Sequence, residues 1–159
     1  MADFSLSDIF GEIDKQATAA GVDPRIVKAL VVAENTGSGS LAGKTSYSGA
    51  AVSPAGARGL MQVMPDTASG LQKAGFLPAD WTHDPKNLTS QVQAGIAAFK
   101  EKMGRMNDPT DLGEVASVYN GSSRTHRAYK AGLFDQLPAE TQQYADKLRR
   151  AIMELGGSA

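Results

Sequence analysis

The segment that decides the fold is Asp23-Pro24-Arg25-Ile26-Val27-Lys28-Ala29-Leu30-Val31-Val32-Ala33-Glu34. An Asp followed by Pro is typical of a helix start, because the Asp side chain caps backbone N–H groups and proline fits the first turn. Val27, Leu30, Val31 and Glu34 then follow at helical spacing, so the carboxylate shares a stripe with aliphatic side chains. Glu34 has two interpretations. It is either a surface carboxylate at the edge of a helix or a desolvated proton donor whose pKa is raised.

Apolar residues recur at helical spacing along most of the remaining chain, which predicts a mainly α fold. Before this segment, Ser5 or Ser7 can cap a helix that Gly21 ends. After it, caps and breakers predict helices that begin near Pro65-Asp66, Asn87 or Thr89, Leu112 and Pro138, and a shorter one over 125–131. We therefore expect about six to eight helices.

Residues 36–58 interrupt this helical pattern. Most of them are Gly, Ser or Ala, which predicts a long loop, with room for a short β-hairpin. Long loops in compact domains are commonly functional or disordered. At the other end, residues 156–159 read Gly-Gly-Ser-Ala and resemble a linker, so we expect one domain spanning 1–159 with a possible linker at its end.

The composition excludes several classes of function. The 159 residues include 17 acidic and 16 basic side chains and no cysteine, which is typical of an ordinary soluble domain without disulfides or thiolate metal sites. This charge balance argues against a nucleic-acid partner. No apolar run approaches the roughly 20 residues of a membrane span. The two histidines, His83 and His126, are far apart in sequence and no phosphate-binding loop is present, so we expect neither a metal nor a cofactor.

A catalytic Glu34 raises the question of a second carboxylate, because ordinary glycosidases use two. No Asp or Glu occurs between residues 35 and 65. The fold could bring in a partner from later in the chain, from among Asp66, Asp80, Asp84 and Glu140. Helix or turn capping already explains Asp66 and Asp84, so a mechanism with one carboxylate fits the sequence better.

Two further groups of side chains admit both a structural and a functional interpretation. The basic run Arg124, His126, Arg127 and Lys130 is usually a solvated helix face, and the alternative is contact with an anionic polymer. Aromatic rings with polar tips suit a saccharide groove, although Tyr119 and Tyr144 would serve equally well in a core. The candidate aromatics are Tyr47, Trp81, Tyr119, Tyr129 and Tyr144.

Four blocks in a fixed order resemble the soluble lytic transglycosylase family, glycoside hydrolase family 23. They are Glu34 at a helix end, Gly59-Leu60-Met61-Gln62-Val63-Met64-Pro65-Asp66-Thr67-Ala68, Val118-Tyr119-Asn120-Gly121, and Glu140-Thr141-Gln142-Gln143-Tyr144. The resemblance covers roughly residues 21–144. It implies the mainly helical, lysozyme-like fold of the α+β lysozyme superfamily.

The resemblance also implies an activity and a set of site residues. The family cleaves the β-1,4 bond between N-acetylmuramic acid and N-acetylglucosamine in peptidoglycan and leaves 1,6-anhydro ends. Glu34 would act first as acid and then as base, and the Tyr144 hydroxyl would orient it. The residues implied to contact the glycan are Asn35, Met61, Gln62, Tyr119 and Asn120.

The chain departs from the family pattern at two places. Asn35 stands where Ser usually follows the catalytic Glu, and Val118-Tyr119-Asn120-Gly121-Ser122 replaces the usual Ala-Tyr-Asn-Ala-Gly. An asparagine amide can still hydrogen-bond a sugar. The second change predicts a groove wall of different width.

Two other functions remain open at this point. A hydrolase resembling goose-type lysozyme would need carboxylates to hold a water molecule, and a non-catalytic cell-wall-binding domain would keep the groove without turnover. We expect a monomer that acts on glycan strands in the periplasm or cell wall. The acidic N-terminus does not match the pattern of a signal peptide, so we expect delivery as a domain of a longer exported protein, within a phage particle or as a released endolysin.

Overall fold

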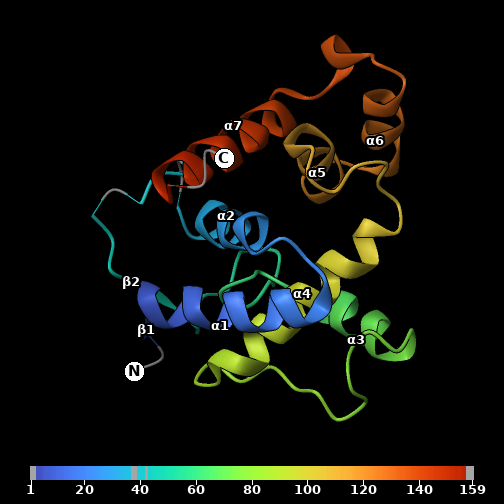
Figure 1. Ribbon diagram of the computed structural model, residues 1–159. Coiled ribbons are helices and arrows are strands. Elements are labelled where there is room, and N and C mark those ends of the chain that lie inside the picture. The colour runs from blue at the N-terminus through green and yellow to red at the C-terminus, as the bar shows by residue number, and fades with distance from the viewer. Residues whose placement is uncertain (1–2, 37–38, 42, 157–159) are drawn as a thin grey trace.

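The computed structural model describes residues 3–36, 39–41 and 43–156, and within them the chain is mainly helical, as predicted. Figure 1 shows helix α2 between α1 and α7, with α5 and α6 following beyond α7. The helices are α1 (Leu6–Ala20), α2 (Pro24–Asn35), α3 (Pro65–Lys73), α4 (Leu88–Met103), α5 (Leu112–Tyr119), α6 (Ser123–Lys130), the 3-10 helix η1 (Phe134–Gln136) and α7 (Ala139–Glu154).

Capping side chains define several of the helix starts that the sequence predicts, whereas α3 and α7 begin without a side-chain cap. Ser5, rather than Ser7, caps α1 and accepts a hydrogen bond from the Asp8 N–H. The Asp23 carboxylate accepts the Arg25 N–H at 2.9 Å at the start of α2. Asn87, rather than Thr89, caps α4 by accepting the Ser90 N–H at 2.9 Å. These contacts satisfy N–H groups that have no partner inside the helix.

The long loop contains the short β-structure that its composition allowed. Strand β2 (Ser46–Ser48) pairs antiparallel with β1 (Asp3–Ser5), and Phe4 lies opposite Tyr47. The partner strand therefore comes from the N-terminus and not from the loop itself. Residues 37–38 and 42 of the loop and 157–159 of the expected linker lie outside the described residues.

The helix that carries Glu34 is the centre of the core. All of Ile26, Val27 and the run 29–33 are buried, so apolar side chains surround α2 on more than the predicted stripe. Helices α1, α4 and α7 supply the neighbouring core residues. Within the described part of the chain, no helix has the length and apolar character needed to cross a bilayer.

The basic run on α6 divides between surface and interior. Arg124, Arg127 and Lys130 are exposed, as expected for a solvated face. His126 is buried instead, with its Nε2 2.8 Å from Oε2 of the buried Glu114 on α5. The expectation of a common solvated face is therefore wrong for His126, because a carboxylate twelve residues away pairs with it inside the fold.

Candidate active site

Glu34 and Tyr144 meet across the interface between α2 and α7. The Tyr144 hydroxyl donates a hydrogen bond of 2.8 Å to Oε1 of Glu34. Tyr144 is buried, and Glu34 is half-buried at the last turn of its helix. The second carboxylate oxygen, Oε2, has no hydrogen-bond partner among the described residues. One oxygen is therefore held in place while the other is available to a bound molecule.

The surroundings of Glu34 favour its protonated form. Burial raises the pKa of the carboxyl, and this effect outweighs the hydrogen bond from Tyr144 and the charge of Lys147, which both lower it. Burial and the nearby Glu34 carboxylate raise the pKa of Tyr144 well above its ordinary value. Tyr144 therefore remains a hydrogen-bond donor, and Glu34 can hold a proton at a higher pH than an ordinary glutamate.

A cavity of about 200 Å³ opens beside this pair. Five of the seven predicted site residues line it: Glu34, Met61, Gln62, Tyr119 and Tyr144. Glu34 is the one carboxylate among its described lining residues. Lys102 of α4 also lines the cavity, and no pattern in the sequence predicts it there.

The turn before α3 positions Met61 and Gln62 through unusual backbone geometry. Gly59 has φ +78° and Gln62 has φ +50°, a region that side chains rarely occupy. The Gln62 amide donates to the Gly59 carbonyl at 2.8 Å, which leaves its Oε1 without a partner among the described residues. Gly95 of α4 allows close packing of Met61, because a Cβ there would collide with the Met61 side chain.

Two side chains from neighbouring helices hold the same turn at Leu60. The Gln91 Oε1 of α4 accepts the Leu60 N–H at 2.9 Å, and its Nε2 donates to the carbonyls of Gly49 and Asp84. The Asn35 amide of α2 donates to the Leu60 carbonyl at 2.9 Å. Sequence spacing gave no signal for the role of Gln91, since its partners lie in three separate loops.

Asn35 and Asn120 do not line the Glu34 cavity. The Asn35 amide is engaged by the carbonyls of Val31 and Leu60. Asn120 donates to Glu140 at 3.2 Å and accepts the Thr141 hydroxyl at 3.1 Å. Both asparagines thus connect segments around the cavity, and their predicted contact with glycan stays a prediction.

Tyr119 and Lys102 also line the cavity. The Tyr119 ring stacks on Phe99 with centroids 5.9 Å apart, and the Lys102 Nζ lies 4.8 Å from the centre of the Tyr119 ring. Burial and the charge of Arg105 lower the pKa of Lys102. The buried Tyr119 hydroxyl has no hydrogen-bond partner in the described part of the chain.

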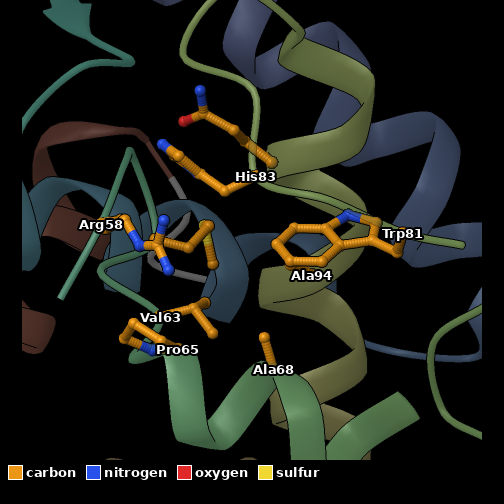
Figure 2. A pocket seen from close by; sticks show the side chains of 9 residues that line it. Arg58, Val63, Pro65, Ala68, Trp81, His83 and Ala94 are labelled. Carbon is orange, nitrogen blue, oxygen red and sulfur yellow. The ribbon is translucent and has the colours of Figure 1, made fainter. Parts of the chain in front are cut away.

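Met61 and Val63 separate this cavity from a smaller one, drawn in Figure 2. Arg58 and His83 lie on one side of the smaller cavity and the Trp81 ring lies on another. Burial lowers the pKa of His83, and the Arg58 charge lowers it further. Trp81 therefore lines the neighbouring cavity and not that of Glu34, whereas Tyr47 is in the core and Tyr129 lines a different cleft.

The other candidate carboxylates lie elsewhere. Asp84 accepts the Lys86 N–H in a turn at 2.9 Å, and Asp66 stands in the first turn of α3. Glu140 bonds Asn120, and Asp80 is exposed. Across residues 3–36, 39–41 and 43–156, no group of three or more acidic, histidine or cysteine side chains is arranged to hold a metal ion.

Comparison with known proteins identifies the family. The model of the transglycosylase SLT domain matches residues 12–147, a range that contains Glu34, the turn at 59–62, Tyr119 and Tyr144. No solved structure shows a significant match to the chain. The mainly helical architecture agrees with the lysozyme-like fold of this family. The chain belongs to the transglycosylase SLT domain family, whose activity is lytic cleavage of cell-wall peptidoglycan.

Proposed function

We propose that the chain cleaves the β-1,4 bond between N-acetylmuramic acid and N-acetylglucosamine without consuming water. Glu34 gives its proton to the glycosidic oxygen as the bond from that oxygen to C1 of the muramic acid breaks. The C6 hydroxyl of the same sugar then forms a new bond to C1, and its proton returns to Glu34. Atoms balance without a second reactant, and the muramic acid ends as a 1,6-anhydro ring.

The observation that carries this proposal is a single half-buried carboxylate in the cavity. An ordinary glycoside hydrolase uses a second carboxylate to activate water or to form a covalent intermediate. Among the described lining residues of the cavity only Glu34 is acidic. The raised pKa of Glu34 supports proton donation at a higher pH than an ordinary glutamate allows, and the hydrogen bond from Tyr144 supports a fixed orientation of the carboxyl.

Other lining groups supply polar contacts suited to a sugar. The Gln62 Oε1 lacks a partner in the described structure and belongs to a residue that lines the cavity. Acetamido N–H and hydroxyl groups of a glycan can donate hydrogen bonds to it. Met61 adds an apolar surface against which a sugar ring can pack. These contacts are part of the proposed binding mode.

Mass analysis of digested peptidoglycan tests the proposal directly. We expect muramic acid ends that are one water lighter than hydrolytic ends, and we expect the Glu34→Gln protein to produce none while remaining folded. Reducing muramic acid ends as the main product would instead assign a lysozyme-like hydrolysis. Binding of peptidoglycan without any product from the wild-type chain would assign a non-catalytic cell-wall-binding domain.

A further inference from the structure

A second, larger cleft of about 710 Å³ lies between the end of α4 and helix α6. Four basic side chains line it, namely Arg105, His126, Arg127 and Lys130, and no acidic residue does so among the described ones. We call this the basic cleft. It contains three of the four residues of the basic run on α6, whose alternative interpretation was contact with an anionic polymer.

The positive charge of the basic cleft is not neutralised from within. Arg127 and Lys130 are exposed and form no ion pair with any residue that the structure describes. Arg105 pairs with Glu101, which lies outside the lining of the cleft. Arg127 and Lys130, together with Arg105, are positive charges in a cleft without a lining carboxylate, and such a cleft suits an anionic ligand.

Glu114, the carboxylate that contacts His126 behind the cleft, already accepts hydrogen bonds from within the protein. Glu114 is buried and accepts the Asn107 and Asp108 N–H groups at 3.0 and 2.8 Å, in addition to its contact with His126. Burial alone would raise the pKa of Glu114, but these hydrogen bonds lower it. Its charge is thus held by internal donors, and the pair with Glu114 fixes the His126 ring at the wall of the cleft.

The basic cleft adjoins the cavity of Glu34. Lys102 and Tyr119 line the Glu34 cavity, while Arg105 and Val118 line the basic cleft. The ends of α4 and α5 therefore separate the two sites, and the Arg105 N–H bonds the Lys102 carbonyl at 3.0 Å across the last turn of α4. A basic surface thus leads away from the catalytic cavity toward α6.

We propose that the basic cleft binds carboxylates of the stem peptide on a glycan strand whose sugars occupy the Glu34 cavity. This inference rests on the proposed function, because it takes peptidoglycan as the bound polymer. The stem peptide is attached to the lactyl group of muramic acid and carries free carboxylates. A peptide of four residues reaches up to about 14 Å, enough to leave a sugar-binding cavity for a neighbouring cleft. Arg127 and Lys130 would therefore favour strands that carry charged peptides.

Equilibrium binding tests this inference independently of turnover. The Glu34→Gln protein is titrated with three labelled glycan strands: one with native stem peptides, one with the peptide carboxylates converted to amides, and one stripped of peptides by an amidase. The test variant adds Arg127→Gln and Lys130→Gln. A matched control adds Arg124→Gln and Arg150→Gln, which remove the same charge from exposed positions outside the cleft.

We expect the test variant to weaken the binding of native strands by about tenfold and to bind the other two strands within twofold of its parent. The control pair should leave the affinity for all three strands within twofold. Stripped strands keep a free lactyl carboxylate. If the test variant also lost affinity for these strands, Arg127 and Lys130 would bind the lactyl carboxylate and not the peptide, which would overturn the inference.

Three other outcomes would also overturn the inference. The Glu34→Gln parent would bind native and amidated strands with equal affinity, or it would bind native strands too weakly to measure. In the third, the test and control variants would lose equal affinity for native strands. The wild-type products decide the proposed function separately. Anhydro ends with no preference for charged peptides would sustain the catalytic proposal and exclude a peptide role for the basic cleft.

Discussion

Replacing Tyr144 with Phe removes the hydroxyl that holds Glu34 and leaves the buried ring in place. The hydrogen bond to Oε1 measures 2.8 Å, and hydrogen bonds to charged groups contribute about 1.5–3 kcal/mol. Because Glu34 is half-buried, water can restore part of the lost contact. We therefore expect Tyr144→Phe to destabilise the fold by about 1–2 kcal/mol and to lower turnover by about tenfold or more.

The same substitution changes how the rate depends on pH. The Tyr144 hydrogen bond lowers the pKa of Glu34, so its removal should raise that pKa further. In the proposed mechanism the active form of Glu34 is the protonated acid, and its population would then persist to higher pH. The alkaline limb of the pH–rate profile should move upward even though the maximum rate falls. A purely structural role for Tyr144 would lower stability without moving the limb.

The assay is release of soluble muropeptides from purified peptidoglycan between pH 4 and 9, together with thermal melts. Tyr47→Phe is the matched control, because the Tyr47 hydroxyl is also buried but has no partner among the described residues. It should keep stability, rate and profile close to those of the wild type. An unchanged profile for Tyr144→Phe, or an equal shift in the control, would refute the reasoning about Tyr144.

Three other substitutions probe the site. Glu34→Gln should be at least as stable as the wild type at pH 7. The raised folded-state pKa of Glu34 makes the free energy of unfolding of the wild type fall as pH rises from about 4.3 through that pKa. Thermal melts of both proteins measure this, and a difference in melting temperature that does not shrink toward pH 4 would contradict it. Gln91→Leu should destabilise the fold by about 3 kcal/mol or more, since one buried N–H and two carbonyls lose their side-chain partner, and urea unfolding measures it; a loss below 1 kcal/mol would exclude an anchoring role. Gly95→Ala should displace Met61 and reduce the rate more than the stability, and unchanged muropeptide release would show that Met61 does not shape the cavity.

Local signals predicted most helices correctly. The Asp23-Pro24 pair and Asn87 act within three residues of themselves, so the sequence alone contains the contacts that start α2 and α4. Contacts between segments that are far apart in the chain could not be predicted from these local signals. Nothing in the spacing of Ser46–Ser48 shows that its partner is the N-terminal strand, and nothing near His126 shows that Glu114 lies beside it.

In the candidate site, too, local patterns predicted single residues but not the contacts between distant ones. Helical spacing placed Glu34 on an apolar stripe, but only the family resemblance joined it to Tyr144, 110 residues away along the chain. The resemblance could not show which way each asparagine faces. Asn35 points to Leu60 because that carbonyl lies within reach of the end of α2, a consequence of how the long loop returns to the core. No motif includes Lys102 or Gln91, and their places beside the cavity and the Leu60 turn follow only from how α4 packs in the fold.

The double attachment of Leu60 bears on how the loop moves. Its N–H is bonded by a side chain of α4 and its carbonyl by a side chain of α2, and the residue itself is fully buried. Local opening of this turn would break both bonds and expose an apolar side chain, so it costs more free energy than the opening of a loop without such attachments. The segment that presents Met61 and Gln62, although irregular in conformation, therefore belongs to the slowly opening part of the molecule. Under the proposed function, adaptation to different glycan strands then falls to the other residues that line the Glu34 cavity, while the turn that carries Met61 and Gln62 keeps one arrangement.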